Sequence, residues 1–238
     1  MYKFPSSSEA TPLGELNLAG SSSGYIDGAA AKFSSPSGVA SDEEGNLYIT
    51  DFLNHVIRKF NSSGFVSTLT GSAPGLDDGP VATAKFYFPN GSAVDKQGNV
   101  YVSEEGANRV RKITPTGQVS TLAGSTAGVS GSADGMGTLA TFANPSGIAV
   151  DDQGNLYIAD QLNHRIRKIT PAGIVSTLAG STSGSADGIG TAAQLHRPVG
   201  VVVDASGNVS KENVSKIKFK IENKRQRFIF CFKDLLPE

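Results

Sequence analysis

The stretch NLYIADQLNHRIRKITPAGIVSTLAG, residues 155–180, occurs three times in this chain with small changes. Residues 46–71 read NLYITDFLNHVIRKFNSSGFVSTLTG, and residues 99–124 read NVYVSEEGANRVRKITPTGQVSTLAG. Because self-similarity at a fixed period is the mark of a repeat architecture, this stretch predicts how the chain folds before any single residue predicts what it does.

The period of the repeat is constant along the chain. A Gly-Asn pair closes one turn in every unit, and the spacings between these pairs are 53, 56 and 53 residues. A proline and an acid keep the same intervals in all units: Pro36, Pro89, Pro145 and Pro198, and Asp42, Asp95, Asp151 and Asp204. Four units are therefore present, and three of them are complete.

Each unit is a succession of short strands. In the third unit, residues 146–151, 155–160, 165–169 and 174–180 are β-branched or alternating runs, separated by turns rich in Gly, Pro, Asn and Asp. Such runs predict one antiparallel meander. A single meander cannot bury both of its partly apolar faces, whereas copies stacked around an axis bury them against one another. The sequence therefore predicts an all-β fold, a β-propeller.

The linkers between units are repeated as well, as SADGMGTLATFANP at residues 132–145 and SADGIGTAAQLHRP at residues 185–198. A bulky apolar residue stands three positions before each repeated proline: Phe33, Phe86, Phe142 and Leu195. We expect these side chains to fill the gaps between adjacent blades. Asp134 and Asp187 are placed to cap a helical turn or to close an Asx-turn.

The segments PSGIAVD, GNLYIAD and NHRIRKI together resemble the NHL repeat family, named for its Asn-His-Leu triplet. The matching positions here are Asn54-His55, Ala107-Asn108 and Asn163-His164, and the resemblance covers about residues 14–208. It implies a propeller of the six-bladed type. The variant with STLAG and DG segments is similar to that of large bacterial envelope and secreted proteins, which implies an extracytoplasmic location.

The chain departs from the family pattern at its ends. We predict a disordered segment at residues 1–13, propeller blades at 14–208 and a divergent basic tail at 209–238. About four blades are visible, three complete and one degenerate, so the ring is incomplete, pairs with a second copy through open blade edges, or closes with four blades. In the tail, residues 216–222 and 227–232 alternate as in a β-hairpin. This hairpin completes or replaces the last blade, or it results from a frameshifted or truncated gene.

Composition excludes several classes of partner. The chain has 21 Lys+Arg against 22 Asp+Glu, and its net charge of −1 gives no general attraction to nucleic acid or anionic membranes. The single cysteine, Cys231, excludes an internal disulfide and a cysteine metal cluster. We expect a soluble protein, because no run is apolar enough for a signal peptide or a membrane span.

The histidines and repeated acids are predicted to be structural. His55 and His164 share one repeat position and are expected to bond to turn backbone groups, and His196 is expected in a loop. The resemblance extends to lyases with zinc and to lactonases with calcium in the channel. However, equivalent histidines two blades apart do not converge on one ion. Acidic residues that occur at the same position in every blade indicate hydrogen bonds within turns rather than ligands of one ion. We therefore expect no metal and no cofactor.

A basic ladder is the candidate binding site. Five arginines of the third strands form an arc on one rim: Arg58, Arg109, Arg111, Arg165 and Arg167. Some NHL domains bind RNA through a positive surface. Three of these arginines, however, stand seven residues after Asp51, Glu104 or Asp160, where cross-strand ion pairs would neutralise them. Nucleic acid is therefore disfavoured, also because aromatic residues that could stack on bases are lacking.

We conclude from the sequence that the chain is a non-catalytic NHL repeat module for interaction with a protein or a glycan. It is expected to be part of, or derived from, a larger propeller protein. Two alternatives stay open. One is a propeller enzyme of the lactonase or lyase type with a channel metal, and the other is RNA binding by the basic rim.

Overall fold

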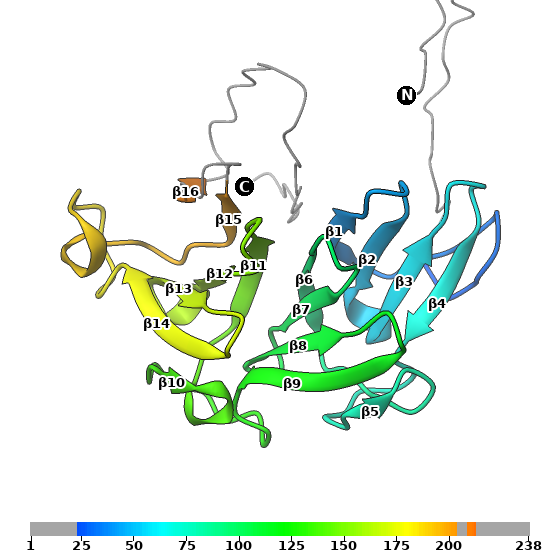
Figure 1. The fold of residues 1–238 in the computed structure, drawn as a ribbon, viewed down its shortest axis with the longest axis horizontal. Coiled ribbons are helices and arrows are strands. Elements are labelled where there is room, and N and C mark those ends of the chain that lie inside the picture. Colours follow the sequence, from blue (N-terminus) through cyan, green and yellow to red (C-terminus); the bar gives the residue numbers. More distant parts are fainter. Residues whose placement is uncertain (1–22, 204–208, 213–238) are drawn as a thin grey trace, which may run out of the picture.

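The repeats form successive antiparallel sheets (Figure 1) in a computed structural model that describes residues 23–203 and 209–212. The first blade pairs its strands in chain order: β1 (Pro36–Ser41), β2 (Leu47–Asp51), β3 (Val56–Phe60) and β4 (Val66–Thr70). The turns from β1 to β2 and from β3 to β4 each contain a glycine with positive φ, Gly45 and Gly64, whereas His55 takes this conformation between β2 and β3. The predicted meander is confirmed.

The next two blades add a short strand from the preceding linker to their outer edge. In the second blade the strands are β5 (Gly79–Pro80), β6 (Pro89–Val94), β7 (Val100–Glu104), β8 (Arg109–Ile113) and β9 (Gln118–Gly124). In the third they are β10 (Gly135–Met136), β11 (Pro145–Val150), β12 (Leu156–Asp160), β13 (Arg165–Ile169) and β14 (Ile174–Ala179). β5 pairs with β9, and β10 pairs with β14. The linker is therefore hydrogen-bonded to the blade that it leads into.

A fourth unit begins with β15 (Gly200–Val203), which pairs antiparallel with β16 (Val209–Glu212). β16 covers the first four residues of the segment assigned to the basic tail and takes the place of a second blade strand. The predicted disordered segment at 1–13 and the hairpin at 216–232 lie outside the described residues.

The first strands of the units lie side by side around a common axis, because β1 contacts β6, β6 contacts β11 and β11 contacts β15 (Figure 1). The last strands β4, β9 and β14 lie on the outer side of the blades, and β5 and β10 lie beyond β9 and β14. This is the arrangement of propeller blades. The helices among the described residues are three-residue 3-10 turns: η1 (Phe52–Asn54), η2 (Gly137–Leu139), η3 (Gln161–Asn163) and η4 (Gly190–Ala192). None of these could cross a membrane.

The core lies between the blades. Phe86 packs in one cluster with Ile57 of the first blade and Val102 of the second, and Phe142 packs with Val110 of the second blade and residues of the third. Leu195 likewise joins the third blade to β15. The prediction that the linker residues fill the gaps between blades is confirmed for these three, whereas Phe33 packs with Phe60 and Val66 of the first blade alone. Apolar burial between neighbours therefore holds the blades together.

The first strands approach too closely for side chains at one repeat position. A Cβ at Gly38, Gly91 or Gly147 would lie 2.5–2.6 Å from a backbone oxygen of the next unit's first strand. The Gly147 N–H also donates to Val199 O of the next unit, at 2.8 Å. The glycine of the repeated Pro-x-Gly sequence is thus required by the contact between neighbouring blades.

Candidate interaction surface

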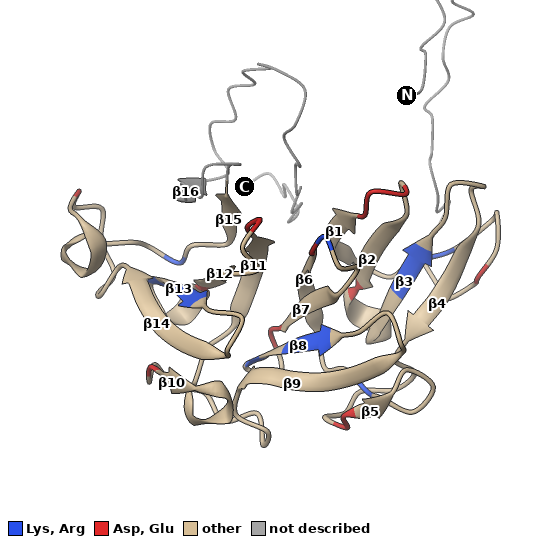
Figure 2. Cartoon of the chain, in the orientation of Figure 1, with Lys and Arg blue, Asp and Glu red and all other residues tan. Residues whose placement is uncertain are grey.

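The predicted cross-strand ion pairs are present in all three complete blades. The nitrogen-to-oxygen distances are 3.1 Å for Arg58–Asp51, 3.1 Å for Arg111–Glu104 and 2.8 Å for Arg167–Asp160. All six side chains have 0% exposure. Figure 2 shows the positive residues of β3, β8 and β13 within the blades. These charges are therefore neutralised inside the sheets.

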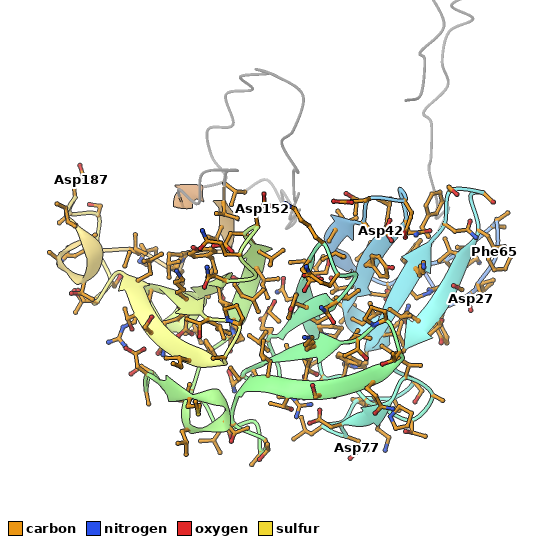
Figure 3. All side chains as sticks on the ribbon, in the orientation of Figure 1. Asp27, Asp42, Phe65, Asp77, Asp152 and Asp187 are labelled. Atoms are coloured by element: carbon orange, nitrogen blue, oxygen red, sulfur yellow. The ribbon has the colours of Figure 1, made fainter. Side chains whose placement is uncertain are left out.

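Each of these arginines also binds a second carboxylate, which comes from the linker: Asp27 at 2.6 Å, Asp78 at 2.7 Å and Asp134 at 2.7 Å. Asp134 additionally accepts bonds from Thr177 N and Oγ1, both at 3.1 Å. Figure 3 shows the equivalent Asp27 beside the outer strand β4. The expectation that Asp134 caps a helical turn is wrong, because η2 has no side-chain cap bond. The aspartate instead ties the linker to its blade.

The pKa of Asp134 agrees with its role in holding the linker on the blade. Partial burial opposes ionisation, but the bonds from Thr177 and the charge of Arg167 outweigh it and lower the pKa of Asp134. The Arg167 guanidinium also lies over the Phe142 ring, 5.2 Å from its centroid. The linker, the third strand and the interblade core therefore meet at one buried guanidinium.

The remaining rim candidates are Arg109 and Arg165. Arg109 is 1% exposed and pairs with Glu104, with 2.6 Å between Nε and Oε2. Arg165 is half-buried and donates to Ser132 O at 3.1 Å. Four of the five arginines of the predicted rim thus have buried side chains. Binding of a partner through these five arginines stays a prediction.

The histidines connect neighbouring units. His55 Nδ1 accepts the Phe88 N–H at 3.1 Å, and His164 Nδ1 accepts the Arg197 N–H at 3.1 Å. In the second blade, Asn108 Oδ1 accepts the Asn144 N–H at 2.9 Å. The expectation of bonds to backbone groups is confirmed, but the donors belong to the next linker rather than to the local turn. Burial lowers the pKa of His55.

His196, expected in a loop, lies in the linker before β15 and its Nδ1 is 2.8 Å from Ser183 Oγ. Within the described ranges, no three His, Cys, Asp or Glu side chains are grouped so that they could hold a metal ion.

The repeated acids close turns, as predicted. Asp42 accepts bonds from Asn46 N, Asn46 Nδ2 and Tyr48 OH at 2.7–3.1 Å. Burial opposes ionisation of Asp42, but these bonds outweigh it and lower its pKa, whereas burial and the nearby carboxylate raise the pKa of Tyr48 to about 12. Asp95 and Asp151 repeat the arrangement, and Asp204 lies outside the described residues.

The connections between blade strands lie alternately on two opposite faces of the propeller. One of them, which we call the turn face, carries the acid-closed turns at 42–46, 95–99 and 151–155. The loop face carries the loops at 52–55, 105–108 and 161–164, together with the residues just before each first strand. On the turn face Lys96 and Asp152 pair with each other at 2.8 Å across two blades.

The loop face instead exposes apolar side chains. Leu53 is 51% exposed, Leu162 is 41% exposed and Tyr87 is 37% exposed. The loops that carry the two leucines are held by partly buried bonds: Asn54 Nδ2 donates to Asp51 and Asn163 Nδ2 to Asp160, each at 2.8 Å. Tyr87 stacks on His55 of the first of these loops, with ring centroids 5.7 Å apart. Apolar groups presented on rigid loops are typical of an interaction surface.

Phenylalanine and tyrosine rings gather on this face at one junction only among those described, between the first and second blades, whereas the third junction has the histidine stack His164–His196, with centroids 5.8 Å apart. Ring centroids are 4.9 Å apart for Phe52–Phe88, 4.7 Å for Tyr87–Phe88 and 4.6 Å for His55–Phe88. The sequence analysis missed this cluster because it followed positions that repeat. The signal was available, since Phe52, Tyr87 and Phe88 replace other residue types at the equivalent positions of the later units.

Family comparisons identify the repeat. The model described as "NHL repeat" matches residues 33–60, and the model described as "Teneurin NHL domain" matches residues 129–188.

Curated relatives are longer proteins. SUPPRESSOR OF QUENCHING 1, a chloroplastic protein of Arabidopsis thaliana, is 29% identical over 72% of this chain and 17% of its own length. Human Teneurin-4 is 32% identical over 68% of this chain and 6% of its own length. Human NHL repeat-containing protein 2 is 30% identical over 69% of this chain and 25% of its own length. The chain thus spans a quarter or less of these relatives.

Solved structures share the fold. A structural genomics protein of unknown function from Bacteroides thetaiotaomicron aligns with a TM-score of 0.59 and 30% identity, over 73% of this chain and 43% of its own. An auxiliary nutrient binding protein from Bacteroides ovatus aligns with 0.55 and 18%, over 73% and 47%. A gluconolactonase from Xanthomonas campestris aligns with 0.50 and 16%, over 75% and 70%. At such identities the last two matches show the fold alone.

Proposed function

Because the chain is an NHL repeat protein with the blades of a β-propeller, we propose that it is a non-catalytic interaction module that binds a protein partner through its loop face. The observation that carries this proposal is the exposure of Leu53 and Leu162 on loops fixed by partly buried hydrogen bonds, with the exposed Tyr87 stacked on His55 of the first loop. Aromatic and aliphatic side chains on a rigid support lose little conformational entropy on binding, so they are suitable anchors for an interface.

The distribution of charge also supports the loop face. The repeated arginines and acids are engaged inside the blades, where they hold the linkers. The groups left for a partner on the loop face therefore include the exposed apolar and aromatic side chains of Leu53, Tyr87 and Leu162. Such a surface favours a protein over nucleic acid, whose phosphates require exposed cations.

The test is a selection of peptides from a displayed library on the immobilised chain. We expect the selected peptides to lose at least about tenfold in affinity for the double variant Leu53→Asp, Leu162→Asp, because charge opposes burial of the two anchor positions. Met136→Asp, on the outer edge strand β10, is the matched control because Met136 is 59% exposed and lies away from these loops. If the double variant and the wild type bound the peptides equally well, the proposal that a partner binds through the loop face would be wrong.

The enzyme alternative has its own readout. If each purified chain held one Ca²⁺ or Zn²⁺ tightly and also hydrolysed a lactone, the protein would be a propeller enzyme and the proposed interaction function would be wrong.

A further inference from the structure

The junction between the first two blades carries a cluster of phenylalanine and tyrosine rings that the later described junctions do not repeat. Phe52 of the first blade stacks on Phe88, which precedes β6, and His55 stacks on the neighbouring Tyr87. At the next junction the positions equivalent to Phe52, Leu53, Tyr87 and Phe88 are Glu105, Gly106, Ala143 and Asn144, and at the following one they are Gln161, Leu162, His196 and Arg197. We call Phe52, Tyr87, Phe88 and Glu105 the aromatic junction.

Two local features show that the rings of the aromatic junction are held in place. Phe88 has φ +50°, in the left-handed region that disfavours a bulky side chain, whereas the equivalent Asn144 is a residue type that adopts it more readily. A Cβ at Gly106 would lie 2.8 Å from both Tyr87 Cδ1 and Phe88 Cδ2. Gly106, where the other two complete blades have leucine, thus makes room for the rings.

A glutamate is bonded through its backbone to the segment that carries these rings. The Glu105 N–H donates to Phe88 O at 3.0 Å. Its Oε2 accepts from Asn90 Nδ2 at 2.6 Å and its Oε1 accepts from Asn144 Nδ2 at 3.3 Å. Both donors are neutral amides, and no lysine or arginine among the described residues lies within ion-pair distance of Glu105. The carboxylate is therefore fixed, partly exposed and not compensated by a cation of this part of the chain.

We propose that the aromatic junction binds a lysine or arginine side chain of the protein partner, with the cation against the Tyr87 and Phe88 rings and close to the Glu105 carboxylate. The proposal rests on the proposed protein-binding function and names the partner chemistry at one place on the loop face. An aromatic ring face attracts a cation, and a fixed carboxylate adds a complementary charge.

The same chain already uses this chemistry inside each blade. The Arg111 guanidinium lies 4.7 Å from the Phe86 ring centroid while it pairs with Glu104 at 3.1 Å. At the aromatic junction the ring and the carboxylate are present at the surface, and the cation must come from outside the described residues.

The probes are two labelled hexapeptides that differ at one residue, arginine or citrulline, with leucine beside it. Citrulline keeps the planar group and its N–H donors but removes the charge. We expect the arginine peptide to bind at least about tenfold more tightly in fluorescence anisotropy, with a difference that shrinks as salt is raised. Equal affinities of the two peptides would overturn the proposal.

Three variants locate the site. Glu105→Gln should weaken the arginine peptide about tenfold and leave the citrulline peptide unchanged. Gly106→Leu restores the residue of the other blades, keeps the carboxylate and displaces the rings, so it should also weaken the arginine peptide. His196→Ala, at the position equivalent to Tyr87 two junctions later, should change neither affinity. An effect of His196→Ala equal to that of Glu105→Gln would contradict the assignment.

The two proposals can fail separately. If library peptides lose binding to the Leu53→Asp, Leu162→Asp variant but not to Glu105→Gln, the loop face stands and the cation site is wrong. Binding of a neutral oligosaccharide such as maltoheptaose that depends on Tyr87 and not on Glu105 would instead identify a glycan site.

Discussion

The histidine of the repeat acts as a hydrogen-bond acceptor between units. His55 and His164 each accept a backbone N–H of the next linker through Nδ1, and Asn108 accepts the same bond through its amide oxygen. Histidine and asparagine share two properties that the position requires: an acceptor at the right reach, and tolerance of a left-handed backbone, here φ +51° to +58°. A protonated imidazole cannot accept this bond, because both of its nitrogens then carry hydrogen.

Acid should therefore weaken the first junction through His55. Its pKa is lowered in the folded protein by burial, so the stability that neutral His55 contributes is present above the unfolded pKa of about 6.5 and is lost as the pH falls below it. We expect His55→Asn to lose less unfolding free energy than the wild type between pH 7.5 and pH 5.5, measured by urea denaturation. The carboxylates are common to both proteins, so an equal loss would show that His55 does not contribute.

A buried arginine depends on its strand carboxylate. Asp160→Asn leaves the Arg167 guanidinium buried with only the linker carboxylate of Asp134, and loss of one partner of a buried pair typically costs about 3–5 kcal/mol. Asp152→Asn, which removes an exposed pair with Lys96, should have no measurable effect. Thermal and urea denaturation compare the two, and similar midpoints for both variants would contradict the structural importance of the buried pair.

At the scale of the elements, the glycine of the Pro-x-Gly sequence sets the distance between first strands. A Cβ at Gly91 would lie 2.5 Å from Ser146 O of β11, whereas a Cβ at Gly200, at the equivalent position of β15, would meet no atom of the described residues within 4 Å. Neither glycine has a positive φ, so the comparison isolates contact from backbone strain. The two positions therefore form a matched pair.

We expect Gly91→Ala to lower the unfolding free energy by about 1–3 kcal/mol, because a methyl group forced into a closed contact displaces one blade against the next. Gly200→Ala should be neutral or slightly stabilising, since alanine has less freedom than glycine in the unfolded chain. Equal destabilisation by both substitutions would mean that another unit packs against Gly200 in solution.

The strands were predictable because turn chemistry and alternation are local. β13 has the predicted bounds, and β11 differs by one residue at each end. The ion pairs within blades were predictable as well, since seven residues across a hairpin place Arg167 opposite the strand of Asp160. The partners of Asp134 and His164 were not, because each is separated by 33 residues or more and depends on the path of a linker.

The aromatic junction was hidden for a different reason. Repeat analysis gives weight to what recurs, and the three rings and Gly106 are departures from the repeat. Their positions could be read from the alignment of the units, but the contact between them requires the φ of Phe88 and the empty space over Gly106. Sequence reasoning therefore finds the scaffold more readily than the surface that is specific to this chain.

At the scale of the whole molecule, each blade strand shares its two sets of side chains between two neighbours. On β7, Tyr101 belongs to the cluster between the second and third blades, whereas the next residue, Val102, belongs to the cluster between the first and second. The second blade therefore has no core of its own, whereas the first also packs Phe60 and Val66 against Phe33 of its preceding segment. Loss of packing at one junction should be transmitted to both blades that form it.

Phe142→Ala tests this cooperativity. Phe142 is 0% exposed at the junction of the second and third blades, and removal of such a ring typically costs about 3–5 kcal/mol. We expect hydrogen exchange to accelerate together in β8 and β9 and in β13 and β14, because both sheets lose the same contacts. Phe65→Ala, an exposed ring on the outer edge of the first blade (Figure 3), is the control and should leave exchange unchanged. Acceleration confined to the third blade would show that the blades fold as independent units, and the shared core would then not explain the stability of the propeller.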